Sequence, residues 1–143
     1  MSKWLVTTGF LTVAIVAAVP DAQSNATVPA VDLGRADFRT YCAACHGVSG
    51  AGDGTIAEFL TITAPDLTQL AKRNAGTFPR DRVTEVIDGR AEVKVHGARD
   101  MPVWGDWFNY EAISEDTDAE ARTMIVSKRI NDLVGFLESI QEN

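Results

Sequence analysis

Apolar residues recur at helical spacing along the C-terminal part of the chain, between positions 126 and 140. Steps of three and four residues place such side chains on one face of a helix, which then packs against the rest of the protein. The sequence Thr117-Asp118-Ala119-Glu120 just before them is typical of a capping box, so we predict a long final helix with Thr117 as its N-cap. Its expected core positions are Val126, Ile130, Leu133, Val134, Leu137 and Ile140.

Shorter helical patterns precede this one. Asp32 is of a type that accepts hydrogen bonds from free backbone amides, and we predict that it caps a helix over residues 32–45. Pro65 and Pro79 suit the starts of two further helices, because proline is favoured at the first helical position. These two helices are expected to end at residues 74–76 and at Gly89.

The segments between these helices are predicted to be mainly loops. A glycine-rich loop follows the first helix, a short helix is expected over residues 56–60, and residues 90–107 show no clear period. Residues 106–116 are acidic and have no assigned role. Because no two segments show the alternation of a β-hairpin, the predicted fold class is all-α. The glycines of the loop are Gly47, Gly50, Gly52 and Gly54.

The N-terminus has the layout of an export signal. Lys3 is followed by an apolar run over residues 4–19, and Ser24-Asn25-Ala26 offers a small-x-small cleavage site. A retained membrane anchor is the alternative, although sixteen helical residues span only about 24 Å of a hydrocarbon core of roughly 30 Å. We predict a signal peptide or anchor over residues 1–26, a linker over 27–31 and a folded domain over 32–143, located in the periplasm.

Composition and charge narrow the function. The chain has 143 residues, with 13 Lys and Arg against 20 Asp and Glu, which gives a net charge of −7. Such a balance disfavours a nucleic-acid partner, because few cations are available to neutralise phosphates. Two cysteines cannot form a disulfide-dense scaffold.

The spacing of those cysteines is the most informative motif. Cys42-Ala43-Ala44-Cys45-His46 is the C-x-x-C-H signature of covalent c-type haem attachment. Two thiols one helical turn apart can each bond a vinyl group of one haem, and the adjacent imidazole can then bind the iron. A haem would also supply the apolar burial that this small chain otherwise lacks.

Three alternative roles for the motif fit the sequence less well. A thioredoxin-like C-x-x-C belongs in a βαβ setting, which the pattern does not show. A zinc site needs two further Cys or His ligands, and only His96 remains in the chain. A plain structural disulfide is the third alternative.

The chain offers three candidates for a second axial ligand of the iron. Met101 lies in the predicted long loop, where Pro102 and Gly105 favour a turn and Trp104 offers an apolar face to cover the haem edge. Met124 lies on the final helix, where packing is the simpler role for it. His96 keeps bis-histidine ligation open as an alternative.

The sequence resembles class I c-type cytochromes, in particular the small bacterial monohaem type, over residues 32–143. The resemblance implies several short helices around one haem, with the N- and C-terminal helices crossing closely at Gly34. It also implies that Phe38 packs against an aromatic side chain of the last helix, namely Phe136. The matching motifs are Gly34-x-x-x-Phe38-x-x-x-Cys42-x-x-Cys45-His46-Gly47, Ala64-Pro65-Asp66-Leu67 and Met101-Pro102-Val103-Trp104-Gly105, with Ala64 where the family usually has glycine.

The resemblance assigns roles to the site residues. Cys42 and Cys45 would hold one haem c, His46 and Met101 would bind its iron, and the carbonyl group of Pro65 would orient the imidazole. With both axial positions filled, the expected function is single-electron carriage between exported redox proteins, without enzymatic activity of its own.

Two other functions are compatible with the sequence. The alternatives are a dedicated electron-transfer subunit of a larger oxidase or dehydrogenase complex, and a five-coordinate haem enzyme or sensor.

The excess of acidic residues favours redox partners with basic patches, although basic side chains near the haem edge could reverse the local charge. The acidic residues concerned are Glu111, Glu115, Asp116, Asp118 and Glu120, and the basic ones are Arg35, Arg39, Lys94 and Arg99.

Overall fold

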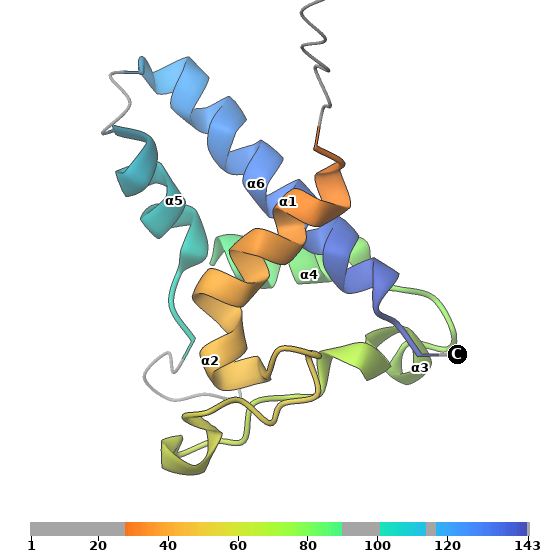
Figure 1. The fold of residues 1–143 in the computed structure, drawn as a ribbon. Helices are drawn as coiled ribbons and strands as arrows, with labels where there is room; N and C mark the ends of the chain where they lie inside the picture. The colour runs from red at the N-terminus through yellow and green to blue at the C-terminus, as the bar shows by residue number, and fades with distance from the viewer. Residues whose placement is uncertain (1–27, 90–100, 114–116, 143) are drawn as a thin grey trace, which may run out of the picture.

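The first and last helices cross at the centre of the structure (Figure 1). The computed structural model describes residues 28–89, 101–113 and 117–142, and within these ranges the chain forms helices and no β-strand. The predicted all-α fold class is confirmed. Residues 1–26 and His96 lie outside the described ranges, and no helix within those ranges is long and apolar enough to span a bilayer.

The helices follow one another with short connections. The first helix, α1, passes through a π-helical turn, η1, directly into α2, so this part of the chain is one bent helix (Figure 1). The start of α1 differs from the prediction, because Pro29 is the N-cap and Asp32 lies in the first turn. The negative charge of Asp32 there interacts favourably with the helix dipole. The elements are α1 (Ala30–Asp37), η1 (Phe38–Cys42), α2 (Ala43–His46), the 3₁₀ turns η2 (Ala57–Phe59) and η3 (Leu67–Gln69), α3 (Leu70–Arg73), α4 (Arg80–Asp88), α5 (Trp104–Ile113) and α6 (Ala119–Ser139).

The crossing of α1 and α6 depends on a glycine. A Cβ atom added at Gly34 would overlap the backbone carbonyl group of Asp132 on α6. One helical turn further along, the rings of Phe38 and Phe136 pack with their centroids 5.1 Å apart. Both contacts agree with those that the resemblance implied.

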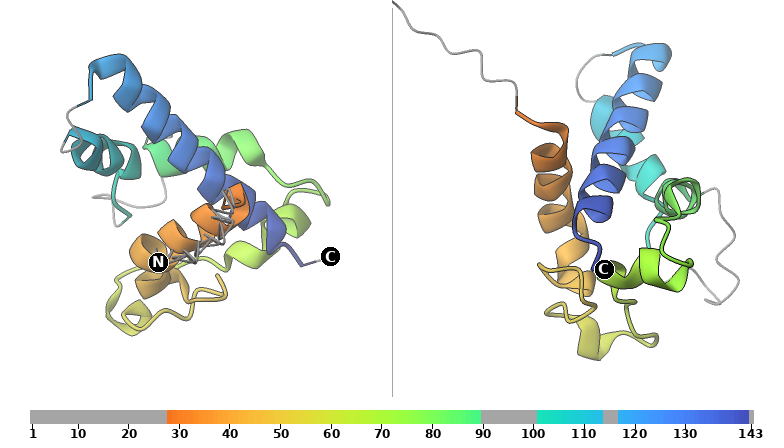
Figure 2. Two further views of the ribbon diagram at one scale, coloured as in Figure 1. Left: turned by 45° about the horizontal axis from the view of Figure 1, so that its top comes forward. Right: turned by 90° about the vertical axis from the view of Figure 1, so that its right-hand side faces the viewer.

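The apolar core lies where the first helix, α4 and α5 pack against α6. Figure 2 shows α1 and α6 side by side, with α4 and α5 next to the last helix. The side chains that are almost fully buried come from three elements, namely Phe38 from η1, Phe108 from α5, and Leu133 and Val134 from α6.

The prediction of a loop up to residue 107 was wrong, because α5 begins at Trp104. The apolar residues Trp104, Phe108 and Ala112 repeat every four positions, and Phe108 and Ala112 are buried against the core. This stripe was obscured in the sequence by aromatic residues on the exposed side of the same helix, Trp107 and Tyr110. The acidic segment 106–116, which had no assigned role, therefore contributes most of a core helix.

Two details of α6 also differ from the prediction. Its N-cap is Asp118, whose carboxylate accepts a hydrogen bond of 2.8 Å from the amide of Ala121, whereas the hydroxyl of Thr117 donates to the carbonyl oxygen of Ala112. Thr117 and Asp118 are both good N-caps. Because the hydroxyl of Thr117 bonds to the end of α5, Asp118 caps α6. Met124 is 62% exposed, so it is not a packing residue.

The helix crossing gives a prediction with a built-in control. Gly34→Ala should lower the free energy of unfolding by about 2 kcal/mol or more, because the new methyl group forces the two helix backbones apart. Gly135→Ala, on α6, places its methyl group where nothing lies within 4 Å, and should stabilise the protein by up to about 1 kcal/mol through helix propensity. Urea unfolding of both variants, followed by far-ultraviolet circular dichroism, measures the two changes. Equal effects of the two substitutions would show that the crossing is not tight.

Candidate functional site

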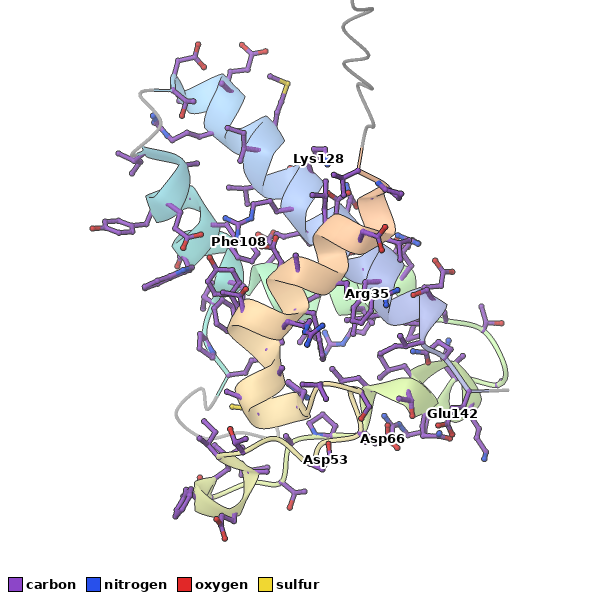
Figure 3. All side chains as sticks on the ribbon, viewed as in Figure 1. Arg35, Asp53, Asp66, Phe108, Lys128 and Glu142 are labelled. Carbon is purple, nitrogen blue, oxygen red and sulfur yellow. The ribbon has the colours of Figure 1, made fainter. Side chains whose placement is uncertain are left out.

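One cavity brings the sequence-predicted site residues together. Its volume is about 340 Å³, and it is lined by side chains from η1, α2, the segment 60–70, α4, the start of α5, and α6. All six predicted residues line it, namely Cys42, Cys45, His46, Pro65, Met101 and Trp104. Figure 3 shows the side chains of the elements around this space.

The bent first helix sets the register of the C-x-x-C-H motif. In η1 the amide of Ala43 bonds to the carbonyl oxygen of Phe38, five residues earlier, so the turn holds one more residue than an α-helical turn. One residue corresponds to about 100° of helix rotation. Phe38 packs against Phe136 of α6 at one edge of the cavity, and Cys42, Cys45 and His46 also line the cavity. Such π turns are frequent at functional sites.

The glycine-rich loop folds back and caps the end of α2. The amides of Gly52, Gly54 and Ile56 donate hydrogen bonds to the carbonyl oxygens of His46, Cys45 and Ala44, at 2.8, 3.2 and 3.0 Å respectively. These carbonyl groups would otherwise be left unpaired at a helix C-terminus. The loop therefore fixes the backbone of the motif from the side opposite α1.

His46 is buried and held in one orientation. Its Nδ1 atom lies 3.3 Å from the carbonyl oxygen of Pro65. Because a carbonyl oxygen only accepts, Nδ1 carries the proton and Nε2 keeps its lone pair, as a metal-binding imidazole requires. Burial lowers the pKa of His46, and the hydrogen bond to Pro65 offsets this only in part, so the neutral ring is favoured.

The replacement of the usual glycine by Ala64 does not strain this loop. Among the described residues other than glycine, only Ala75 has a positive φ. Ala64 therefore adopts an ordinary backbone conformation, and it is buried next to Gly52.

The surroundings of Cys42 disfavour thiol–disulfide exchange. Both cysteines are free, and burial, with smaller contributions from Asp37 and Cys45, raises the pKa of Cys42 to about 12. Thiol–disulfide exchange of the thioredoxin type requires a lowered thiol pKa. Over the described part of the chain, which does not include His96, no group of three or more His, Cys, Asp or Glu side chains is arranged to hold a metal ion.

The rest of the cavity wall is almost entirely apolar. Such a lining suits a flat apolar group that is bonded through the two cysteines and bound at its metal by His46. Arg82, on α4, is the one described cation in the wall. The aliphatic side chains come from four regions: Leu60 and Ile62, Leu67 and Leu70, Val83, Val86 and Ile87, and Leu133 and Leu137.

Of the candidates for the second axial ligand, Met101 is the one placed at the cavity. It is half-buried in the cavity wall, three residues before α5, whereas the exposed Met124 does not line the cavity. Met101 is therefore the only methionine among the described residues whose sulfur could reach a group bound there. His96, the bis-histidine alternative, lies outside the described ranges.

The sequence did not single out two residues, one in the cavity wall and one that joins the helices around the cavity. Tyr41 lines the cavity, and its ring lies 5.6 Å from those of Trp104 and Phe108. Its place directly before Cys42 was the available signal. Arg129, in the middle of α6, binds two carboxylates that are 18 and 92 residues away in sequence, and no local pattern indicates such distant contacts.

Comparison with known protein families supports the same interpretation. The chain matches the family model for cytochrome c over residues 31–140, which is most of its length. The chain belongs to the cytochrome c family. Neither the comparison with curated proteins nor that with solved structures gave a match. As a cytochrome c, the protein is a haem-based electron-transfer protein, its haem is of the covalently bound c type, and its partners are redox proteins.

The packing of the glycine-rich loop of this cytochrome against residues 64 and 65 can be tested with two glycines that share the same φ. Gly52 and Gly76 both have φ near +85°, but an added Cβ overlaps the carbonyl oxygen of Ala64 only at Gly52. Gly76→Ala should cost about 1–2 kcal/mol, the strain of a left-handed alanine. Gly52→Ala should cost about 2 kcal/mol more, because the loop must also move away from residues 64 and 65. Guanidinium unfolding of the two variants compares them directly, and equal losses would mean that this packing contributes nothing.

Proposed function

We propose that this cytochrome carries single electrons between exported redox proteins, through one haem iron bound by His46 and Met101. One observation carries the proposal: two thiols, an oriented imidazole and a thioether all line the same apolar cavity. Haem, when bound, supplies an iron that changes reversibly between the ferric and ferrous states.

The chain's own residues perform three tasks. Cys42 and Cys45 hold the group to the end of the first helix, so that it stays in place through repeated cycles. Pro65 fixes the imidazole of His46, which supports ligation from one side. Met101 would supply the second protein ligand of the iron. An iron bound by both side chains would have no open site for oxygen or peroxide, which favours a carrier over an enzyme.

The composition of the cavity wall also affects the reduction potential of the iron. A thioether ligand and an apolar environment both disfavour the additional charge of ferric haem, and both therefore raise the potential. The helices that form the wall are packed around Phe38, Phe108, Leu133 and Val134, which are almost fully buried. A wall held this firmly keeps the same ligands in both oxidation states, which lowers the reorganisation that accompanies each transfer.

The proposal that the protein is exported rests on residues 1–26. Their basic start, apolar run and small-residue site are typical of a signal peptide. A periplasmic location follows from that pattern, and retention of the segment as an anchor would instead keep the domain at the membrane surface.

The ligand assignment is tested by a matched pair of methionine variants. In wild-type ferric protein we expect the weak far-red band of sulfur-to-iron charge transfer. Met101→Ala should abolish that band, lower the potential and allow cyanide to bind, whereas Met124→Ala should change none of these, because its side chain is exposed on α6. If His96→Ala had these effects and Met101→Ala had none, the ligation would be bis-histidine and the proposal wrong. A wild-type protein that binds carbon monoxide at an open iron would favour a sensor or enzyme.

The surface charge predicts how partners approach. The formal charge is −7, although Glu111 is paired with Arg129 rather than free on an acidic surface. Net negative charge should attract cationic partners and repel anionic ones over distances of about 8–10 Å at physiological salt. We therefore expect oxidation by a small cationic reagent to slow as ionic strength rises, and oxidation by an anionic reagent to accelerate. Stopped-flow rates measure both, and the reverse pattern would indicate that basic residues such as Arg35 and Arg39 dominate the docking face.

A further inference from the structure

A cluster of polar side chains joins the cysteine-bearing helix to α5 through α6. The guanidinium of Arg129, on α6, donates two hydrogen bonds to Asp37 on α1, from Nε at 3.0 Å and from Nη2 at 2.8 Å. Its Nη1 donates a third, of 2.7 Å, to Glu111 on α5. Glu111 also accepts hydrogen bonds from the hydroxyl of Tyr41, at 2.9 Å, and from the indole of Trp107, at 3.0 Å.

Aromatic rings continue the same cluster into the cavity wall. The guanidinium carbon of Arg129 lies 4.0 Å from the centroid of the Phe108 ring, a cation–π distance. Figure 3 shows Phe108 projecting from α5 towards the first and last helices. Tyr41 packs against both Phe108 and Trp104, and Tyr41 and Trp104 line the cavity.

The ionic groups of the cluster are partly shielded from solvent and remain charged. Only 24% of the Arg129 side chain and 21% of the Asp37 side chain are exposed. The hydrogen bonds to Asp37 raise the pKa of Arg129 against the opposing effect of burial. Burial alone would raise the pKa of Glu111, but the hydrogen bonds from Arg129, Tyr41 and Trp107 outweigh it and lower the pKa. Loss of Arg129 would take the guanidinium away from the largely shielded carboxylate of Asp37, which is more costly than loss of an exposed pair.

The cluster acts on the segment next to the site. Met101 is three residues from Trp104, the first residue of α5, and three residues reach at most about 10 Å. The position of α5 therefore limits where Met101 can lie. The cluster holds α5 to the helix that carries Cys42, Cys45 and His46, so it links the two sides from which the iron would be bound.

We propose that Arg129 is a positioning residue that holds α5, and through it Met101, against the iron. This inference rests on the proposed ligation by Met101 and adds a residue that the family match does not assign. In its absence α5 is less firmly docked, the thioether dissociates more often, and an added ligand competes for the iron more successfully. A ligand that binds only the open state gains apparent affinity in proportion to the population of that state.

The chain provides a matched control for a general loss of stability. Arg80, on α4, forms an ion pair with Glu138 on α6, so it also joins two helices, but neither is α5. Arg80→Gln and Arg129→Gln make the same chemical change, in which a guanidinium is replaced by an amide. Only the second removes ionic contacts that tie α5 and the cysteine-bearing helix to α6.

The test uses the haem-loaded full protein and titrates its ferric form with imidazole. Arg129→Gln should raise the apparent affinity for imidazole at least about fivefold, the lower end of typical coupling between sites, and should weaken the far-red band. Arg80→Gln should leave both as in the wild type. Glu111→Gln, which keeps the shape of the side chain, should act in the same direction as Arg129→Gln and provides the test if that variant does not fold.

A double variant separates positioning of Met101 from other effects of Arg129. In a Met101→Ala background the iron is already open, so Arg129→Gln should add nothing to the affinity for imidazole. Three results would overturn the positioning role. The affinity for imidazole could rise equally in both backgrounds, it could be unchanged in Arg129→Gln, or it could rise by the same factor in Arg80→Gln. Absence of the far-red band from the wild type would instead overturn the ligation by Met101, and the positioning role with it.

Discussion

The backbones of α1 and α6 meet so closely at Gly34 that a single added methyl group would overlap the carbonyl group of Asp132. This close crossing places two parts of the cavity wall. Beyond the crossing, the first helix bends through η1 and presents the C-x-x-C-H motif, while α6 contributes Leu133 and Leu137 to the same space. The packed pair of Phe38 and Phe136 maintains the spacing of the two helices next to the cavity.

Packing and hydrogen bonds restrain the donors of the site. The motif is fixed by the helix before it and by the amides of the glycine-rich loop after it, and the imidazole of His46 is fixed by the carbonyl group of Pro65. On the other side, α5 is docked by buried Phe108 and by the ion pairs of Arg129. A cytochrome benefits from such restraint, because an electron carrier works best when its ligands do not rearrange between oxidation states.

Most residues of the site could be predicted from the sequence, but fewer of the elements and contacts that hold them in place. The C-x-x-C-H pentapeptide, Pro65 and Met101 were all found in the sequence, because these residues act through short motifs, and the structure places them in one cavity. Helix α5 was missed because exposed Trp107 and Tyr110 obscure its apolar stripe. The N-cap of α6 was assigned one residue too early, since Thr117 and Asp118 are both competent. The role of Arg129 depends on Asp37, a contact across 92 positions that no local pattern encodes.

The family and the apolar cavity together imply a fold that closes around covalently attached haem, and our proposal sets the number of haems at one. The decisive test is the intact mass of the purified protein after denaturation, read together with a pyridine haemochrome spectrum. We expect a mass equal to that of the polypeptide plus one haem, with the spectrum of a haem bound through two thioether bonds. A mass equal to the polypeptide alone, or haem that separates from the chain on denaturation, would contradict this structure of the site.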